Sequence, residues 1–204
     1  MTDANSTKRF TRKFYRQASP VVAQRLLGSY LHRVIDGVEL VGKIVETEAY
    51  GGEDEACHAF RGMTPRNAIM FGDAGFSYVY FTYGMHHCFN VTTNEEGIGE
   101  AILIRAVEPI TGIQAMRKFR PIALRDRDLA NGPGKLCQAF GLSRVENGVD
   151  LIESEELFIT QRPPLNAASI CTSSRIGINV ATHYPWRFFI EGNEFVSKGK
   201  PSKP

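Results

Sequence analysis

The sequence has no long apolar run. Its longest apolar stretches, such as 101–104 and 186–190, are far shorter than the roughly 20 residues that a membrane-spanning helix needs, so we expect no membrane-spanning segment. Residues 2–16 are polar and basic and lack the apolar stretch of a cleaved secretory signal, so we expect the protein to stay where it is made. Internal repeats and low-complexity linkers are also missing. We therefore expect one domain over residues 1–204, with flexible tails at 1–13 and 198–204.

Cysteine is scarce and widely spaced. Cys57, Cys88, Cys137 and Cys171 are separated by 31, 49 and 34 residues, whereas zinc ribbons and redox motifs use pairs a few residues apart. We interpret the four as reduced thiols. The composition, with 43% hydrophobic and 23% charged residues, excludes a disordered or fibrous chain.

Strong net charge is absent too, because the 24 basic and 22 acidic residues leave only +2. The charges are unevenly distributed, however. Residues 51–100 carry 2 basic and 7 acidic side chains, whereas residues 1–50 and 101–150 each carry 8 basic and 5 acidic ones. Basic flanks around an acidic segment suit an enzyme that acts on nucleic acid, and they also occur in many other soluble proteins.

The pattern of apolar and turn residues predicts an α+β fold. We expect strands, rich in β-branched and aromatic residues, at 29–34, 38–50, 77–83, 88–93, 101–107, 157–160, 174–178 and 187–190. We expect helices at 19–27, with Ser19 as the N-cap, and at 111–120 and 135–140. The strands predict a single domain with a curved, mostly antiparallel sheet, surrounded by helices and carrying a protruding β-hairpin.

The expected strand at 38–50 places two carboxylates next to apolar residues. If the strand is regular, its period of two puts one set of side chains on the same face: Leu40, Ile44, Glu46, Glu48 and Tyr50. A carboxylate beside apolar neighbours has its charged form disfavoured, which can tune it to act as a general base. The alternative is an edge strand with two solvated glutamates.

A metal site is a second possibility for this region. Its acidic and imidazole side chains could bind a hard cation, as in a metal-dependent nuclease: Glu46, Glu48, Asp54, Glu55 and His58. No pair among them has a ligand spacing that forces the side chains together. We therefore expect no metal.

Residues 77–90 read as two strands joined by a turn at Tyr83, Gly84 and Met85. Tyr78 and Tyr80 then point to one face, while Tyr83 falls at the turn, where it has little to pack against. Aromatic side chains in such positions are used as wedges between bases. The alternative is that these tyrosines are half-buried sheet residues.

Lys135 ends a Gly-Pro-Gly-Lys segment that opens an expected helix. Free backbone amides at a helix start, with a lysine beside them, suit a phosphate. The spacing is not that of a nucleotide-binding loop, so we interpret the segment as a contact for the DNA backbone or as a plain helix start.

Several motifs, in this order along the chain, resemble the alkyladenine (3-methyladenine) DNA glycosylase family. They are Lys43-Ile-Val-Glu-Thr-Glu-Ala-Tyr50, Ala56-Cys-His58, Thr64-Pro-Arg-Asn67, Tyr78-Val-Tyr80, Tyr83-Gly-Met85, Asn90, Leu103-Ile-Arg105 and Asn131-Gly-Pro-Gly-Lys-Leu136. The resemblance covers roughly residues 14 to 197. It implies a monomeric base-excision repair enzyme without metal or other cofactor, which binds double-stranded DNA and hydrolyses the N-glycosidic bond of a damaged purine. The implied lesions are 3-methyladenine, 7-methylguanine, hypoxanthine and ethenoadenine.

The resemblance also implies roles for individual residues. Glu48 is similar to the general base, and Arg105 to the group that holds the attacking water. The remaining matches fall on a base pocket and a DNA surface: Tyr50, Ala56, His58, Tyr80 and Asn90 for the flipped base, and Tyr83, Met85 and Lys135 for DNA. Asn90 is similar to the residue that clashes with the 2-amino group of normal guanine. The sequence departs from the family pattern at Cys57, His86 and His87.

The chemistry itself calls for a carboxylate. Departure of a purine leaves an oxocarbenium-like sugar, and one glutamate can stabilise that charge and deprotonate water. Two other functions stay open, a metal-dependent nuclease and a catalytically silent binder of damaged DNA. The expected location is the cytoplasm (nucleoid) of a bacterium or the nucleus of a eukaryote.

Overall fold

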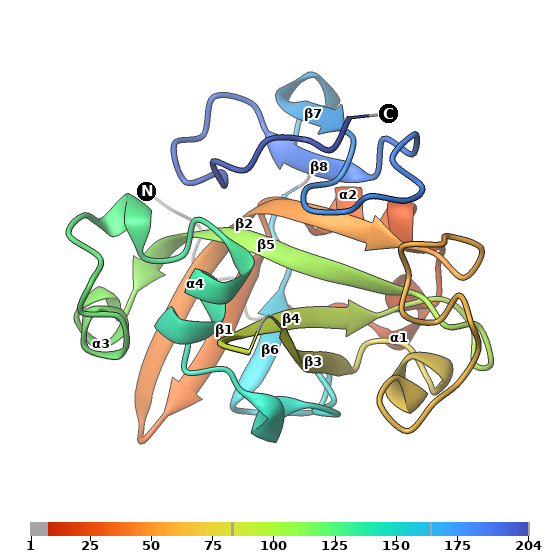
Figure 1. The fold of residues 1–204 in the computed structure, drawn as a ribbon. Helices are drawn as coiled ribbons and strands as arrows, with labels where there is room; N and C mark the ends of the chain where they lie inside the picture. Colours follow the sequence, from red (N-terminus) through yellow and green to blue (C-terminus); the bar gives the residue numbers. More distant parts are fainter. Residues whose placement is uncertain (1–7, 83, 164, 204) are drawn as a thin grey trace.

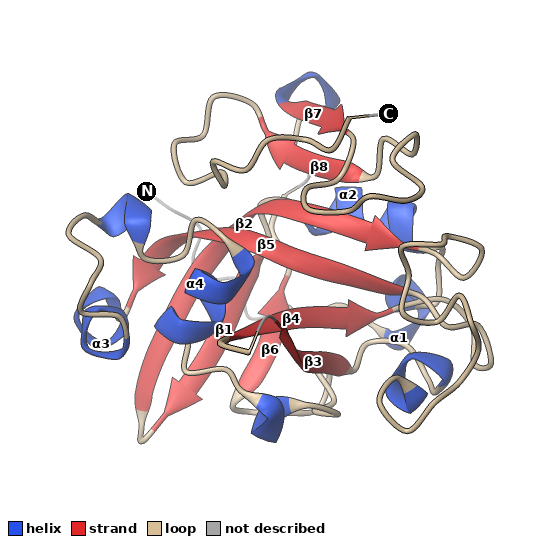
Figure 2. Cartoon of the chain, in the orientation of Figure 1, coloured by secondary structure: helices blue, strands red, loops and turns tan. Residues whose placement is uncertain are grey.

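The computed structural model describes residues 8–82, 84–163 and 165–203. A curved sheet dominates the fold, and the helices around it are short (Figures 1 and 2). The helices are α1 (Arg12–Tyr15), α2 (Ser19–Leu26), α3 (Ile113–Phe119) and α4 (Pro133–Ala139), with 3-10 turns η1 (Ala68–Phe71), η2 (Asp126–Asp128), η3 (Arg144–Glu146) and η4 (Ala167–Ser169). None of the helices in the described residues has the length and apolar character to span a bilayer.

Eight strands form the sheet, and every pairing is antiparallel. They are β1 (Tyr30–Ile35), β2 (Val38–Tyr50), β3 (Ser77–Thr82), β4 (His86–Thr92), β5 (Ala101–Thr111), β6 (Leu157–Thr160), β7 (Ile170–Ser173) and β8 (Arg187–Ile190). The order is β3-β4-β5-β2-β1-β6, and β8 pairs with both β2 and β7. This confirms the predicted α+β fold with a curved antiparallel sheet.

Strand β2 changes its partner halfway along its length. One edge pairs with β5, while the other pairs first with β1 and then, from Glu46 to Glu48, with β8. Between these two partners the backbone of Ile44 bonds to Gly28 and Ser29 instead. The sheet therefore branches at β2, and the second half of this strand lies beside β8 in the sheet (Figure 1).

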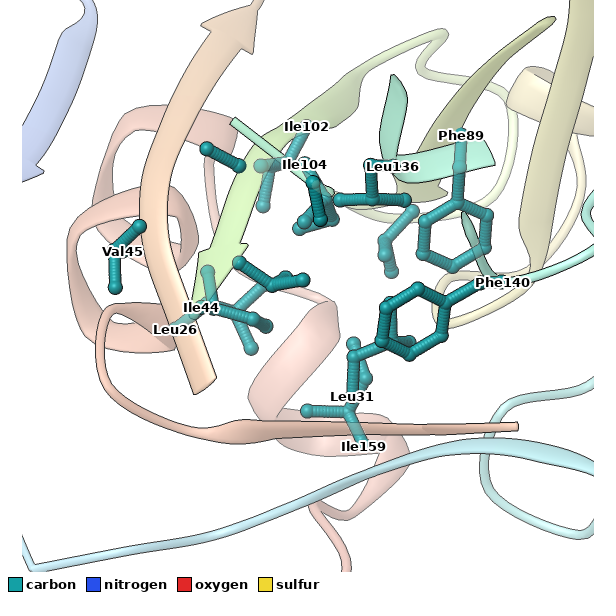
Figure 3. Close-up of a cluster of buried hydrophobic side chains, with 14 of the residues drawn as sticks. Leu26, Leu31, Ile44, Val45, Phe89, Ile102, Ile104, Leu136, Phe140 and Ile159 are labelled. Atoms are coloured by element: carbon teal, nitrogen blue, oxygen red, sulfur yellow. The ribbon is translucent and has the colours of Figure 1, made fainter. Parts of the chain in front are cut away.

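An irregularity at the branch point reverses the two faces of β2. The pairing with β5 shifts between Ile44 and Glu46 and again between Glu46 and Thr47. Consecutive residues Ile44 and Val45 both belong to the main core (Figure 3). An extra residue in a strand moves every later side chain to the other face. The prediction that Glu46 and Glu48 share the face of Ile44 is therefore wrong, because the strand is not regular.

The core lies between the sheet and helices α2 and α4. Leu31, Ile104, Leu136 and Phe140 are fully buried there, together with Leu26 (Figure 3). Each such side chain contributes roughly 1.5–3 kcal/mol by leaving water. On the core face of β2, the Thr47 hydroxyl donates to the Ala23 carbonyl of α2 (2.9 Å). The core thus fixes the strand whose opposite face carries the two carboxylates.

Several element boundaries differ from the sequence predictions. Helix α2 includes Ser19, and its N-cap is Ala18. Helix α4 begins at Pro133 in place of Lys135, because proline suits the first turn of a helix. No strand forms at 174–178, which is a loop; Gly177 there has a φ of +77°, incompatible with a regular strand. Strand β7 precedes this loop.

The segments expected to be flexible tails make defined contacts. Arg9 forms a β-bridge with Thr160, and Arg12 lies in helix α1 and pairs with Asp150 (2.5 Å). At the other end, Ser202 donates a backbone hydrogen bond to the Arg175 carbonyl (2.8 Å). The structure thus differs from the expectation for residues 8–13 and 198–203. The rest of the expected tails, residues 1–7 and 204, lies outside the described residues.

Candidate active site

A cavity of about 370 Å³ opens where β2, β3, β4 and β5 meet two loops, 54–58 and 176–178. This volume lies within the range of pockets for small organic ligands. Six of the residues predicted from the sequence line it: Tyr50, Ala56, His58, Tyr80, Asn90 and Arg105. Residues up to 55 positions apart in the sequence, Tyr50 and Arg105, therefore form one site.

Glu48 lies directly behind the cavity wall and is fully buried. Its Oε2 accepts hydrogen bonds from the Tyr50 hydroxyl (2.9 Å) and from Arg105 (3.0 Å), both of which line the cavity. Its Oε1 accepts from the backbone N–H of Ile176 (2.7 Å). Three donors thus hold the carboxylate in one orientation at the point where Tyr50 and Arg105 converge.

Glu46, two residues earlier, is a structural hub. Its carboxylate accepts from Arg105 Nε (3.1 Å), from Arg187 Nε (2.7 Å) and from both the backbone N–H and the hydroxyl of Ser197 (2.7 and 2.9 Å). All of these groups are buried. A buried charge is tolerated when it is paired and hydrogen-bonded in this way. Glu46 therefore serves to position Arg105, while Glu48 is the carboxylate nearer the cavity.

Arg105 joins the two carboxylates. Burial works against its charge, but the carboxylates of Glu48 and Glu46 raise its pKa above the ordinary arginine value. The guanidinium is thus a fixed cation at the cavity wall.

Asp54 and Arg175 form a second buried ion pair. The two guanidinium nitrogens of Arg175 bond to both oxygens of Asp54, and both side chains are fully buried. Asp54 also accepts from the backbone N–H of Ala56 (3.0 Å), which holds the loop that carries Ala56 and His58. Asp54 and Glu46 are thus occupied by arginines. Within the described residues no three His, Cys, Asp or Glu side chains are grouped as metal ligands.

Tyr50 forms one wall of the cavity. The Arg175 guanidinium lies over the Tyr50 ring, 4.6 Å from the ring centroid. Because Arg175 does not line the cavity, it covers the face of the Tyr50 ring that points away from the cavity. Burial, reinforced by the charge of Glu48, raises the pKa of Tyr50 well above its ordinary value. Tyr50 is therefore a neutral phenol that donates to Glu48.

His58, Tyr78 and Tyr80 form the facing wall. The ring centroids of His58 and Tyr80 are 4.6 Å apart, and those of Tyr78 and Tyr80 are 5.4 Å apart. His58 Nδ1 lies 2.8 Å from the Tyr78 hydroxyl. Burial, aided by Arg66, lowers the pKa of His58, so the imidazole is neutral near pH 7. An aromatic surface on either side of the cavity is suited to stacking a planar base.

Asn90, which pairs with Tyr78 across β3 and β4, also lines the cavity. Its amide nitrogen donates to the Tyr78 carbonyl (2.9 Å), and the residue is buried. A side chain held in this way cannot move aside for an extra exocyclic group. The geometry therefore suits the steric role that the resemblance implies for Asn90.

The comparisons with known proteins agree with this geometry. A family model described as methylpurine-DNA glycosylase matches residues 13–194. The chain belongs to this family. It is a DNA glycosylase, an enzyme that hydrolyses the N-glycosidic bond of a base in DNA.

Three relatives with provisional names as 3-methyladenine DNA glycosylases illustrate the similarity. The one from Carboxydothermus hydrogenoformans is 48% identical over 92% of this chain and 97% of its own length. One from Francisella tularensis is 47% identical over 86% of this chain and 92% of its own. One from Chlorobaculum tepidum is 44% identical over 97% of this chain and 94% of its own.

The hairpin β3–β4 of the glycosylase presents apolar side chains to solvent. Phe81 is 45% exposed and Met85 is 67% exposed. Tyr83, predicted as the wedge, lies outside the described residues. Lys135, on α4, bonds to Asn131 (2.7 Å) and lines a groove that shares Thr82, Cys88 and Pro133 with the main cavity. Lys135 therefore lies next to the cavity, and Met85 lies in the turn three residues after Thr82, which lines the cavity.

Cys57, His86 and His87, where the sequence departs from the family pattern, are not among the aromatic side chains that form the cavity walls. Cys57 packs against Ala59 and Tyr78 behind the cavity, and burial raises the pKa of its thiol to about 12. All four cysteines of the glycosylase are free, as predicted. His86 packs against Gly134 and His87 against Phe81, so neither lines the main cavity.

Four residues that hold the site together were missed by the sequence analysis: Arg175, Ile176, Arg187 and Ser197. They lie 121 to 151 residues from the carboxylates that they bond. No local pattern marks them, since the expected strand at 174–178 hid the turn that aims the Ile176 amide at Glu48. The general rule that a buried carboxylate must be hydrogen-bonded is the one signal that such donors exist, and it does not say which residues supply them.

Proposed function

We propose that this glycosylase flips damaged purines out of duplex DNA into the aromatic cavity and hydrolyses the N-glycosidic bond with Glu48 as the general base, acting as a monomer. The observation that carries the proposal is a carboxylate held by three donors directly behind a cavity with aromatic walls. The lesions would be 3-methyladenine, 7-methylguanine, hypoxanthine and ethenoadenine.

In this mechanism the base stacks between Tyr50 and the facing rings His58 and Tyr80. As the purine departs, the Glu48 carboxylate stabilises the developing positive charge at the sugar and accepts a proton from the attacking water. Arg105 orients that water and holds Glu48 in place. Neutral wall rings do not repel a purine that carries a positive charge, and their faces attract it.

We further propose that the enzyme is monofunctional. Strand cleavage by a glycosylase through a Schiff base requires an amine nucleophile. Among the described residues, no lysine lines the cavity. The reaction therefore ends with free base and an intact abasic strand.

One assay tests the proposal. A duplex containing hypoxanthine or ethenoadenine is incubated with the protein, with and without EDTA, and free base and alkali-labile sites are measured. We expect free base at the same rate in both conditions and no covalent adduct with borohydride. A rate that collapses in EDTA and returns with magnesium would support the nuclease instead, and binding without release would support the silent binder.

A further inference from the structure

The C-terminal segment 197–202 lies against the active site, outside the part of the chain that the family model matches, which ends at residue 194. In Figure 1 this segment, in dark blue, lies beside β7 and β8 at the top of the view. It contacts two structures that hold Glu48 and Arg105. These are the Glu46 carboxylate and the loop 174–178.

The first contact is made by Ser197. Its backbone N–H and its hydroxyl donate to the two oxygens of Glu46, and the residue is 9% exposed. Glu46 in turn binds Arg105 Nε. The start of the segment therefore completes the hydrogen bonding of the buried carboxylate that positions Arg105.

The second contact runs along the loop 174–178. Ser202 donates its backbone N–H to the Arg175 carbonyl (2.8 Å), accepts at its carbonyl from the Ser174 hydroxyl (2.7 Å) and accepts at its hydroxyl from the Ile178 N–H (3.2 Å). Pro201 forms a β-bridge with Ile176. The end of the segment thus acts as a short extra strand for this loop.

The contact is also tightly packed. A Cβ added at Gly199 would come within 2.7 Å of the Ile176 side chain. The loop held in this way supplies the Ile176 N–H that donates to Glu48, and Ile176, Gly177 and Ile178 line the cavity. Among the described hydrogen bonds, the Ile178 N–H has no acceptor other than Ser202 of this segment.

We propose that residues 197–202 form a strap that positions the catalytic groups, with Ser197 acting on Arg105 through Glu46 and Ser202 acting on Glu48 through the 174–178 loop. Ser197 and Ser202 are positioning residues, because neither lines the cavity. The proposal rests on the proposed function, since it concerns the residues assigned to base excision.

The test compares the full chain with a variant that lacks residues 199–204. Single-turnover excision of hypoxanthine at saturating enzyme should fall by about tenfold or more, since misplaced catalytic groups act on the chemical step. The Kd for the damaged duplex should change by less than about threefold, because the DNA-facing groups remain. A truncated protein that excises at the rate of the full chain would overturn the proposal.

A matched pair of variants keeps the test decisive if the truncated chain does not fold. Ser202→Ala loses the hydroxyl that accepts from Ile178, while Ser202→Thr keeps one. We expect an excision rate lower by about three- to tenfold for Ser202→Ala, the loss of one hydrogen bond, and near the full-length rate for Ser202→Thr. Equal rates in the two variants would overturn the role of the Ser202 hydroxyl.

Amide hydrogen exchange provides a readout that does not depend on catalysis. The N–H groups of Ile176 and Ile178 should exchange about tenfold faster or more in Ser202→Ala, while core amides of β2 and β5 stay unchanged. Unchanged exchange would overturn the strap. If the full chain releases no base from any lesion, the proposed function fails, while the exchange experiment still decides whether the strap exists.

A charge control separates the strap from attraction to DNA. The segment carries exposed Lys198, Lys200 and Lys203, and the triple change to Gln keeps the backbone and serine contacts. The saturating excision rate of this variant should equal that of the full chain. A loss as large as that of the truncated chain would assign the effect to charge and overturn the positioning role.

Discussion

Strand β2 and the β3–β4 hairpin both border the cavity, but they hold their side chains in opposite ways. On β2 the charges of Glu46 and Glu48 are fully buried and each carboxylate is bonded by several donors. On the hairpin, Phe81 and Met85 expose apolar surface to solvent. The carboxylates of β2 find their hydrogen-bond donors within the protein, whereas the hairpin has apolar side chains that only a further molecule would cover.

The difference indicates how work is divided within the site. A preorganised, water-excluded network keeps its geometry during the reaction, which suits the chemical step. Exposed apolar side chains near a pocket suit insertion into a base stack, so their contribution depends on the DNA. Changes in β2 should therefore affect excision or stability strongly, whereas changes in the hairpin should act on flipping and vary with the lesion.

The largest effect is expected for Glu48→Gln. The amide keeps the shape of the side chain but loses the base, so single-turnover excision should fall by about 10²- to 10⁴-fold, while binding to damaged duplex stays nearly unchanged. Glu46→Gln is the matched control on the same strand. It should lower the free energy of unfolding, since Arg187 and Arg105 lose a buried partner. Its saturating excision rate should fall much less than that of Glu48→Gln. An inactive, stable Glu46→Gln beside an active Glu48→Gln would exchange the two roles.

Breaking the second buried pair should destabilise the fold. Arg175→Met leaves Asp54 as an unpaired buried charge and should lower the free energy of unfolding by about 3–5 kcal/mol, measured by urea titration. The double variant Asp54→Asn with Arg175→Met should recover part of that loss, because no charge is left buried. If the single and double variants unfold at the same urea concentration, the pair contributes only through packing.

Removing the predicted wedge should have a moderate effect. Tyr83→Ser should reduce the flipped population by about ten- to a hundredfold, since the wedge recovers roughly 1–3 kcal/mol of stacking per base. Ethenoadenine fluorescence reports that population. The loss should be smallest for a lesion in a mismatch, where extrusion costs less. An equal flipped population in the variant and the wild type would mean that Tyr83 is an ordinary surface residue and not the wedge.

The smallest effect concerns pH. Burial lowers the pKa of His58, so the folded protein keeps the ring neutral down to a lower pH than the ordinary histidine value of about 6.5. The resulting contribution to stability is present above pH 6.5 and is lost as the pH falls below it. Protonation of His58 adds a positive charge beside the base. Excision of 7-methylguanine relative to hypoxanthine should therefore fall a few-fold, and only below about pH 6.5.

His58→Gln serves as the control for that experiment, because glutamine does not titrate. Its ratio of 7-methylguanine to hypoxanthine excision should be flat over the same pH range. The same fall in the variant would assign the pH dependence to another group.

Much of the fold followed from local patterns. Strand β2 was predicted with its observed bounds, as were β6 and β8, because long runs of β-branched and aromatic residues between turns mark strands directly. Helix α2 formed within one residue of its predicted start, and Tyr78 and Tyr80 share a face, as a period of two requires. These properties depend on neighbours in the chain.

The face that carries Glu46 and Glu48 was decided by tertiary structure. A regular period places them with Ile44, but the shift in pairing where β2 meets β5, β1 and β8 moves them to the opposite face. Donors to these carboxylates come from Ile176, Arg187 and Ser197, brought in by the folding of distant segments. The sequence by itself determined which side chains could do the chemistry and which strand carries them. Their partners and their final orientation depended on tertiary structure, because a buried charge takes its donors from whatever the fold places beside it.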